Sequence, residues 1–152
     1  MGVYITTSKN PSLKTRTFCE ALSRLVPMSS LEQRGSKSVE QISKRAKLLG
    51  KSRVLFVYEK NATPSEMCFM KVKAHSWEWA GEGISISKFR VHKIPSGLPS
   101  EMIMKGDRKE EFEELLDSCK PEGDDFVELR CSKSKLSFYY EKRPLMEMEL
   151  IK

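Results

Sequence analysis

The sequence predicts a mixed α/β (α+β) fold, with helices packed on a mixed sheet. Short β-branched and aromatic runs alternate with segments in which apolar residues recur every three to four positions. The 152 residues are enough for one domain with its own core. We therefore expect a single domain over 1–152. Because both halves offer strands, a helix and a terminal hairpin, an internal duplication into about 1–80 and 81–152 is also open.

The chain opens with a strand and a helix. The run Val3–Thr6 has the β-branched and aromatic composition of a strand. Apolar residues then recur with helical spacing from Leu13 to Val26. Ser12 is placed to cap this helix, and Pro27 ends it.

A second strand and helix follow. Residues 28–34 form a short strand candidate that Gly35 closes. Ser38 and Gln41 have the spacing of a capping box, and Gly50 is a natural helix stop. The sequence thus predicts a helix between Ser38 and Gly50.

The middle of the chain reads as strands. The apolar run Val54–Tyr58 and the alternating segment Met67–Val72 predict a hairpin. The triplet Gly81–Gly83 predicts a tight turn. The next strand is expected at Ile84–Ile94, where the apolar alternation changes step and indicates a bulge near Ser87–Lys88.

The last third contains one helix among strands. Pro95–Pro99 is expected to be a loop. Asp107 is placed to cap a helix whose apolar stripe runs from Phe112 to Cys119, and Pro121 follows it. Three strand candidates close the chain: Phe126–Cys131, Leu136–Glu141 and Met146–Ile151.

Positive charge is concentrated in the first third of the chain. The whole sequence has 27 Lys and Arg against 21 Asp and Glu, a net charge of +6. Residues 1–53 carry 11 of these basic residues and three acidic ones, a net charge of +8, whereas the rest of the chain has a net charge of −2. This asymmetry favours a polyanionic partner, and RNA, DNA and an acidic membrane surface all qualify.

Cysteine and histidine spacing argues against a metal site. The four cysteines form no C-x-x-C pair, and His75 and His92 lie near none of them in sequence. We expect buried, reduced cysteines, no metal and no cofactor. The opening residues lack a continuous apolar stretch, and no later run approaches the ~20 residues of a bilayer span, so we expect a cytoplasmic protein without a membrane partner.

One segment carries a family resemblance. Residues 5–27 read ITTSKNPSLKTRTFCEALSRLVP, and Gln33-Arg34-Gly35 and Lys37-Ser38 follow. This pattern resembles the opening signature of the Brix domain, a family of ribosome-assembly proteins. Lys9 stands where the family usually has Arg, which keeps the charge but loses the planar guanidinium. Val26 replaces the usual Phe before Pro27.

The resemblance implies both a fold and a role. The chain looks like the minimal archaeal form of the family, with two α/β halves similar to the anticodon-binding domain of class IIa aminoacyl-tRNA synthetases. The implied role is non-enzymatic: binding of ribosomal RNA or its precursor during ribosome assembly and rRNA processing. A protein-interaction adaptor that contacts ribosomal proteins or assembly factors is the alternative. A nuclease is disfavoured because residues 1–53 have three scattered carboxylates rather than a cluster.

The same segment is the candidate RNA-binding site. A strand-end loop that leads into a helix N-terminus can bind an anion, although the loop can equally serve as a turn and cap alone. Trp77 and Trp79 are candidates for stacking on bases if exposed, but core packing or a hairpin brace is favoured for them. The candidate RNA contacts are Ser8, Lys9, Asn10, Ser12, Lys14, Arg16, Arg34, Lys37 and the lysine face Lys44, Lys47 and Lys51.

Overall fold

The structure is a computed structural model that describes residues 2–118 and 120–151. Its elements, in chain order, are β1 (Val3–Thr7), α1 (Leu13–Leu25), β2 (Ser29–Leu31), α2 (Val39–Leu48), β3 (Arg53–Lys60), β4 (Thr63–Val72), β5 (Trp77–Val91), β6 (Met102–Lys105), α3 (Lys109–Leu116), β7 (Val127–Cys131), β8 (Lys135–Tyr140) and β9 (Arg143–Ile151). The mixed α+β prediction is confirmed.

The nine strands of the described residues belong to one sheet, in the order β2-β1-β3-β4-β5-β9-β8-β7-β6. Strand β1 is parallel to both β2 and β3, β6 is parallel to β7, and the other neighbours are antiparallel. The long strand β5 pairs with β4 over its first part and with β9 over its last part. It therefore joins an N-terminal half of the sheet (β1–β5) to a C-terminal half (β6–β9).

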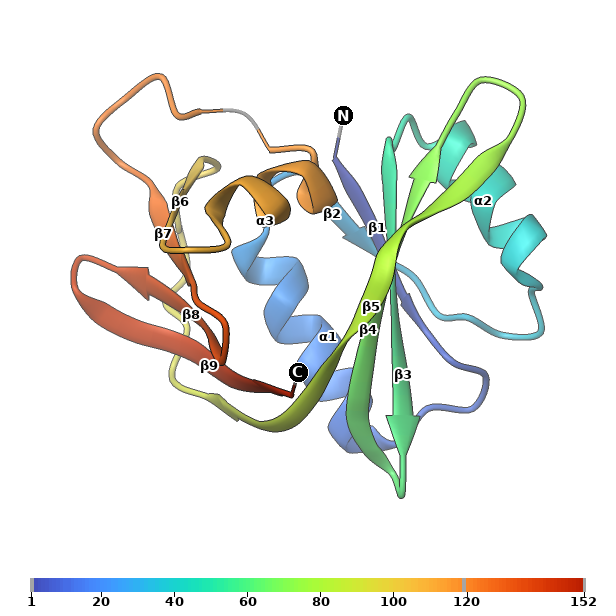
Figure 1. Cartoon of the computed structure of the whole chain (residues 1–152), viewed down its shortest axis with the longest axis horizontal. Helices are drawn as coiled ribbons and strands as arrows, with labels where there is room; N and C mark the ends of the chain where they lie inside the picture. Colours follow the sequence, from blue (N-terminus) through green and yellow to red (C-terminus); the bar gives the residue numbers. More distant parts are fainter. Residues whose placement is uncertain (1, 119, 152) are drawn as a thin grey trace.

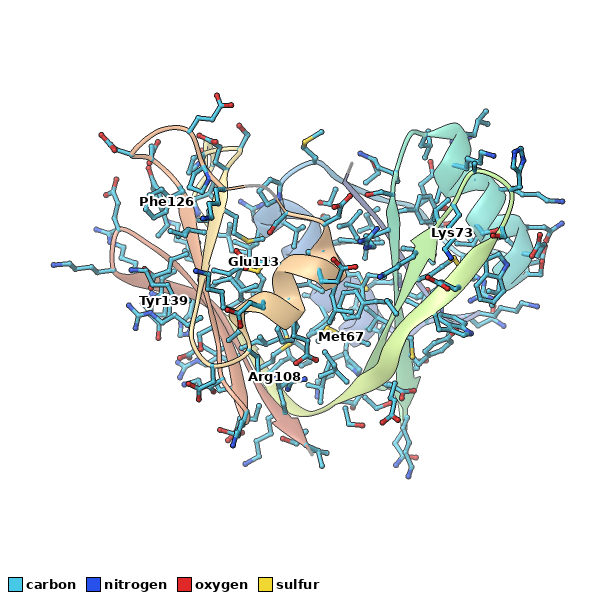
Figure 2. All side chains as sticks on the ribbon, turned by 45° about the horizontal axis from the view of Figure 1, so that its top comes forward. Met67, Lys73, Arg108, Glu113, Phe126 and Tyr139 are labelled. Atoms are coloured by element: carbon cyan, nitrogen blue, oxygen red, sulfur yellow. The ribbon has the colours of Figure 1, made fainter. Side chains whose placement is uncertain are left out.

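The helices lie on two sides of this sheet. Helices α1 and α3 lie between the two halves, whereas α2 lies on the outer face of the N-terminal half (Figure 1). Side chains of both halves and of α1 and α3 form the main core, and Figure 2 shows them filling the space around α3, with Tyr139 on the side of the C-terminal half away from that helix. A second, smaller core forms where α2 covers Tyr4, Phe56 and Met70.

The predicted helix starts at Ser12 and Ser38 are confirmed. The Ser12 side chain accepts the backbone N–H of Thr15 at the start of α1. The Ser38 side chain accepts the backbone N–H of Gln41, whose own side chain accepts the Ser38 N–H, so the capping box is complete. These bonds satisfy backbone N–H groups at the helix starts, which have no carbonyl partner within the helix.

The predicted tight turn at Gly81–Gly83 is wrong. These residues lie within β5, where Met67 pairs with Ile84 and Phe69 with Ala80, so the triplet bulges out opposite Cys68. Gly81 and Gly83 have φ values of 75° and 87°, which suit a bulge as well as a turn. The bulge expected near Ser87–Lys88 is confirmed by the register shift between Ile86 and Lys88.

Two features of the last third differ from expectation. Arg108, not Asp107, is at the N-cap of α3, and it makes no side-chain capping bond. Strand β6 was not predicted, because its four residues acquire their conformation by pairing with β7. The three closing strands are confirmed, and Cys119 lies outside the described residues.

The strand pairing of the first half recurs in the second. The set β1-β3-β4-β5 is joined by one parallel and two antiparallel pairs, and so is the set β6-β7-β8-β9. The boundary expected near residue 80 falls within β5, which is continuous from Trp77 to Val91. The internal duplication and the similarity to anticodon-binding domains stay predictions.

Candidate nucleic-acid interface

The sheet has a topological switch point beside β1. The chain leaves the carboxyl end of β1 for α1 on the inner face, and it leaves the carboxyl end of β2 for α2 on the outer face. Because the two connections diverge from neighbouring strands, they leave a crevice between them. Such crevices are the usual ligand sites of open sheets.

The switch-point crevice has a volume of about 610 Å³. The loop after β1 contributes Thr7, Asn10 and Pro11, α1 contributes Arg16, Cys19 and Glu20, and the segment Leu31–Gly35 forms the opposite wall. Three of the expected RNA contacts, Asn10, Arg16 and Arg34, therefore line one crevice, although they are far apart in sequence.

The rim of the crevice carries exposed polar groups. Lys9, Asn10 and Arg16 are exposed, and Asn10 has the left-handed φ of 53° that turns the chain from β1 into α1. Ser8 anchors this loop, because its backbone N–H donates to the carbonyl of Val57 in β3. The Ser8 hydroxyl is buried and has no hydrogen-bond partner among the described residues.

The N-terminus of α1 already holds a carboxylate. Glu59 of β3 accepts hydrogen bonds at Oε2 from the Ser12 N–H (3.1 Å) and the Thr15 hydroxyl (2.5 Å), and the Ser12 hydroxyl lies 2.8 Å away. These bonds, the Thr15 hydroxyl first, hold the pKa of Glu59 below its usual range. Ser12 is thus committed within the protein and is not free for the ligand contact expected from the sequence.

Arg34 is also committed within the protein. Its side chain is 6% exposed, and its guanidinium donates to the carbonyls of Lys37 (2.6 Å) and Thr7 (3.0 Å). The same group lies 5.5 Å from the ring centre of Phe56. Arg34 therefore fixes the wall after β2 against β1, a role that the sequence alone did not indicate.

A carboxylate network holds the same wall from the other side. Glu32 accepts the Tyr4 hydroxyl (3.0 Å) and a bidentate pair from Arg45 of α2 (2.9 and 3.0 Å). The Arg45 hydrogen bond is the main cause of the lowered pKa of Glu32, and burial is the main cause of the raised pKa of Tyr4. No sequence spacing indicates this network, because Tyr4, Glu32 and Arg45 are brought together only by the tertiary fold.

The remaining candidate cations are spread over four places. Lys14 is exposed, and its ammonium lies 5.9 Å from the ring centre of Phe89. Lys37 is half-buried near the crevice, whereas Lys44 and Lys47 are exposed on α2. Lys51 lies beyond the end of α2 and donates to the Met28 carbonyl (2.7 Å), so it is not part of a helical lysine face.

The two tryptophans lie on the outer face beside α2. The Trp77 indole N–H donates to Glu40 of α2 (2.6 Å), so Trp77 braces β5 against that helix. Trp79 is 44% exposed and packs edge-on against Trp77 and Phe56. Neither tryptophan lines the switch-point crevice.

The described residues hold no group of three or more His, Cys, Asp or Glu side chains placed to bind a metal. Cys19 and Cys131 are buried and Cys68 is half-buried, all with free thiols. Burial raises the pKa of the Cys19 thiol to about 12, which keeps it protonated at neutral pH. No helix within residues 2–118 and 120–151 is long and apolar enough to cross a membrane.

Comparison with curated proteins finds archaeal relatives, although no protein-family model matches the chain. A "Probable Brix domain-containing ribosomal biogenesis protein" of Pyrococcus horikoshii is 34% identical over 77 residues, which are 51% of this chain and 34% of the relative. A protein of the same name from Saccharolobus solfataricus is 42% identical over 62 residues, 41% of this chain and 36% of the relative. The matched segment thus spans about a third of the length of these curated relatives.

Comparison with solved structures finds the same fold. A probable ribosomal biogenesis protein from Aeropyrum pernix superposes with a TM-score of 0.86 at 20% identity, covering 99% of this chain and 96% of the other. Mil, an archaeal Imp4-like protein, gives a TM-score of 0.72 at 19% identity, covering 97% and 95%. Together with the curated relatives, these structures confirm the resemblance inferred from residues 5–38.

Proposed function

We propose that this chain, a homologue of archaeal Brix domain-containing ribosomal biogenesis proteins, binds ribosomal RNA or its precursor during ribosome assembly. The names of its relatives indicate a ribosome biogenesis protein. RNA suits this region because three exposed cations lie close together in the chain: Lys9 on the loop after β1, and Lys14 and Arg16 on the first turn of α1, with Arg16 lining the crevice.

The exposed rim of the switch-point crevice carries this proposal. The backbone of the loop is fixed by the Ser8–Val57 hydrogen bond and by Glu59 at the start of α1. The cationic side chains remain solvent-exposed on that fixed backbone, so they can contact phosphates while the loop keeps its shape.

Salt dependence gives the first test. Three neutralised phosphates on a single strand predict a log–log slope of about −2 for the binding constant against salt. Binding of fluorescent fragments of ribosomal RNA precursor, measured by anisotropy from about 50 to 300 mM salt, gives this slope. A slope near zero would contradict a phosphate-contacting site.

A triple substitution locates the site. Lys9→Ala, Lys14→Ala and Arg16→Ala together are expected to remove most of the affinity and most of the slope. The matched control removes three exposed cations from the second half: Lys93→Ala, Lys133→Ala and Arg143→Ala. Equal losses in both variants would indicate a diffuse charge effect, and unchanged binding in the first would refute the site.

The adaptor alternative predicts a different outcome. If ribosomal proteins or assembly factors provide the main contacts, capture of ribosomal particles by the tagged protein would survive ribonuclease and high salt. RNA binding predicts that both treatments abolish capture.

A further inference from the structure

The switch-point crevice contains one uncommitted cation and one uncommitted anion. Arg34 donates to backbone carbonyls, and Glu32 is paired with Arg45. Arg16 and Glu20, by contrast, line the crevice, are exposed, and take part in no ion pair within residues 2–118 and 120–151. A ligand bound in this crevice would therefore contact both a guanidinium and a carboxylate.

These two groups lie one turn apart on α1 without pairing. Residues four apart lie on the same face of a helix, and a cation that precedes an anion is the less favourable order for such a pair. A carboxylate beside Arg16 also repels phosphate. A site that bound only phosphate would bind it more tightly without Glu20. The presence of Glu20 therefore favours a ligand that also carries a hydrogen-bond donor.

Unpaired RNA supplies such a donor. Bases outside a helix are recognised by hydrogen bonds to their Watson–Crick edge. A carboxylate is an acceptor with two oxygens, which fits two adjacent parallel N–H donors. Guanine alone among the four bases presents two such donors side by side on that edge, its ring N–H and its amino group.

The crevice also has the size and walls for a nucleotide. Its volume of about 610 Å³ lies within the usual range for small-ligand sites. Pro11 and Leu31 supply apolar wall surface for the face of a base. We infer that the crevice takes an unpaired guanosine of the bound RNA, with Glu20 on the base edge and Arg16 on the phosphate.

This inference rests on the proposed RNA-binding function, and a comparison of base preferences tests it separately. The probes are fluorescent five-nucleotide RNAs, all uridine except for a central G, A, C or U. We expect the wild-type protein to bind the G probe about 10-fold more tightly than the A and U probes. Glu20→Gln should reduce this ratio to below about 2-fold, because an amide opposes one of the two guanine donors.

Two further variants separate base reading from charge. Glu82→Gln removes an exposed carboxylate from the β5 bulge, and it should leave the ratio unchanged. Arg16→Ala should weaken all four probes by a similar factor and keep the ratio. Using a ratio cancels any general gain in affinity that comes from removing a negative charge.

The outcomes are distinguishable. RNA binding without a guanine preference, or a preference that Glu20→Gln leaves intact, would overturn the inference but not the proposed function. Absence of binding both to these probes and to fragments of ribosomal RNA precursor would overturn both. Melting temperatures of all variants, measured in parallel, show whether a lost preference comes from unfolding.

Discussion

Replacing Glu59 with glutamine tests how the loop before α1 is held. The Glu59 carboxylate accepts the Ser12 N–H and the Thr15 hydroxyl, and it lies beside the Ser12 hydroxyl. A hydrogen bond to a charged group contributes about 1.5–3 kcal/mol. Because Glu59 is half-buried and glutamine keeps one acceptor oxygen, we expect a loss of about 1–2 kcal/mol in the free energy of unfolding. For a chain of this size, that lowers Tm by roughly 2–8 °C.

The pH dependence makes this prediction specific. The folded-state pKa of Glu59 is lowered, chiefly by the Thr15 hydrogen bond. A lowered pKa contributes stability above the unfolded-state value of about 4.3, and this stability is lost as the pH falls through the folded-state value. The difference between wild type and Glu59→Gln should therefore be full at pH 7 and shrink below about pH 4.

Urea unfolding followed by circular dichroism at pH 7, 5, 4 and 3 measures this difference. Glu82→Gln is the matched control, since its carboxylate is exposed and it should change stability little at any of these pH values. A Glu59→Gln variant as stable as the wild type at pH 7, or a deficit that stays constant down to pH 3, would refute the assignment.

Three other substitutions probe the walls of the crevice and the contact between the halves. Tyr4→Phe removes the hydrogen bond to Glu32 and should cost about 1 kcal/mol in urea unfolding. Arg34→Lys keeps the charge but loses the planar donors to two carbonyls. We expect it to lower the free energy of unfolding by about 1–2 kcal/mol in the same assay, and a gain in stability would contradict this role. Glu114→Gln breaks the ion pairs that the exposed Glu114 of α3 makes with Arg53 and Lys71 of the N-terminal half. We expect a small loss of stability by calorimetry that vanishes at high salt.

Local sequence signals predicted those elements whose conformation is fixed by near neighbours. The capping box at Ser38 is one example, because both of its partners lie within one turn. The glycine triplet in β5 is the opposite case. Positive φ values occur in turns and bulges alike, so only the pairing of Met67 with Ile84 distinguishes them.

The candidate RNA contacts stay predictions, and the structure shows only where those residues lie. The sequence placed them at residues 8–16 and 34–51, and the structure opens a crevice beside the first of these segments. It could not show that Arg34 is buried over Phe56, because those residues are 22 positions apart. Nor could it show that Glu59, which follows the expected strand Val54–Tyr58, reaches the start of α1.

Only some of the basic residues in the first third of the chain are free to contact RNA. Of its 11 basic residues, Arg45 and Arg53 form ion pairs. Four more donate to backbone carbonyls: Arg24, Arg34, Lys37 and Lys51. Two of the others, Lys44 and Lys47, lie on α2, on the opposite side of the sheet from α1. A short RNA bound at the crevice and across the first turn of α1 can thus contact about three cations, so its salt slope should be near −2 rather than the roughly −6 that a net charge of +8 would suggest. Only RNA long enough to pass around the edge of the sheet can also reach the α2 lysines. We therefore expect a steeper salt slope for such RNA than for a short one.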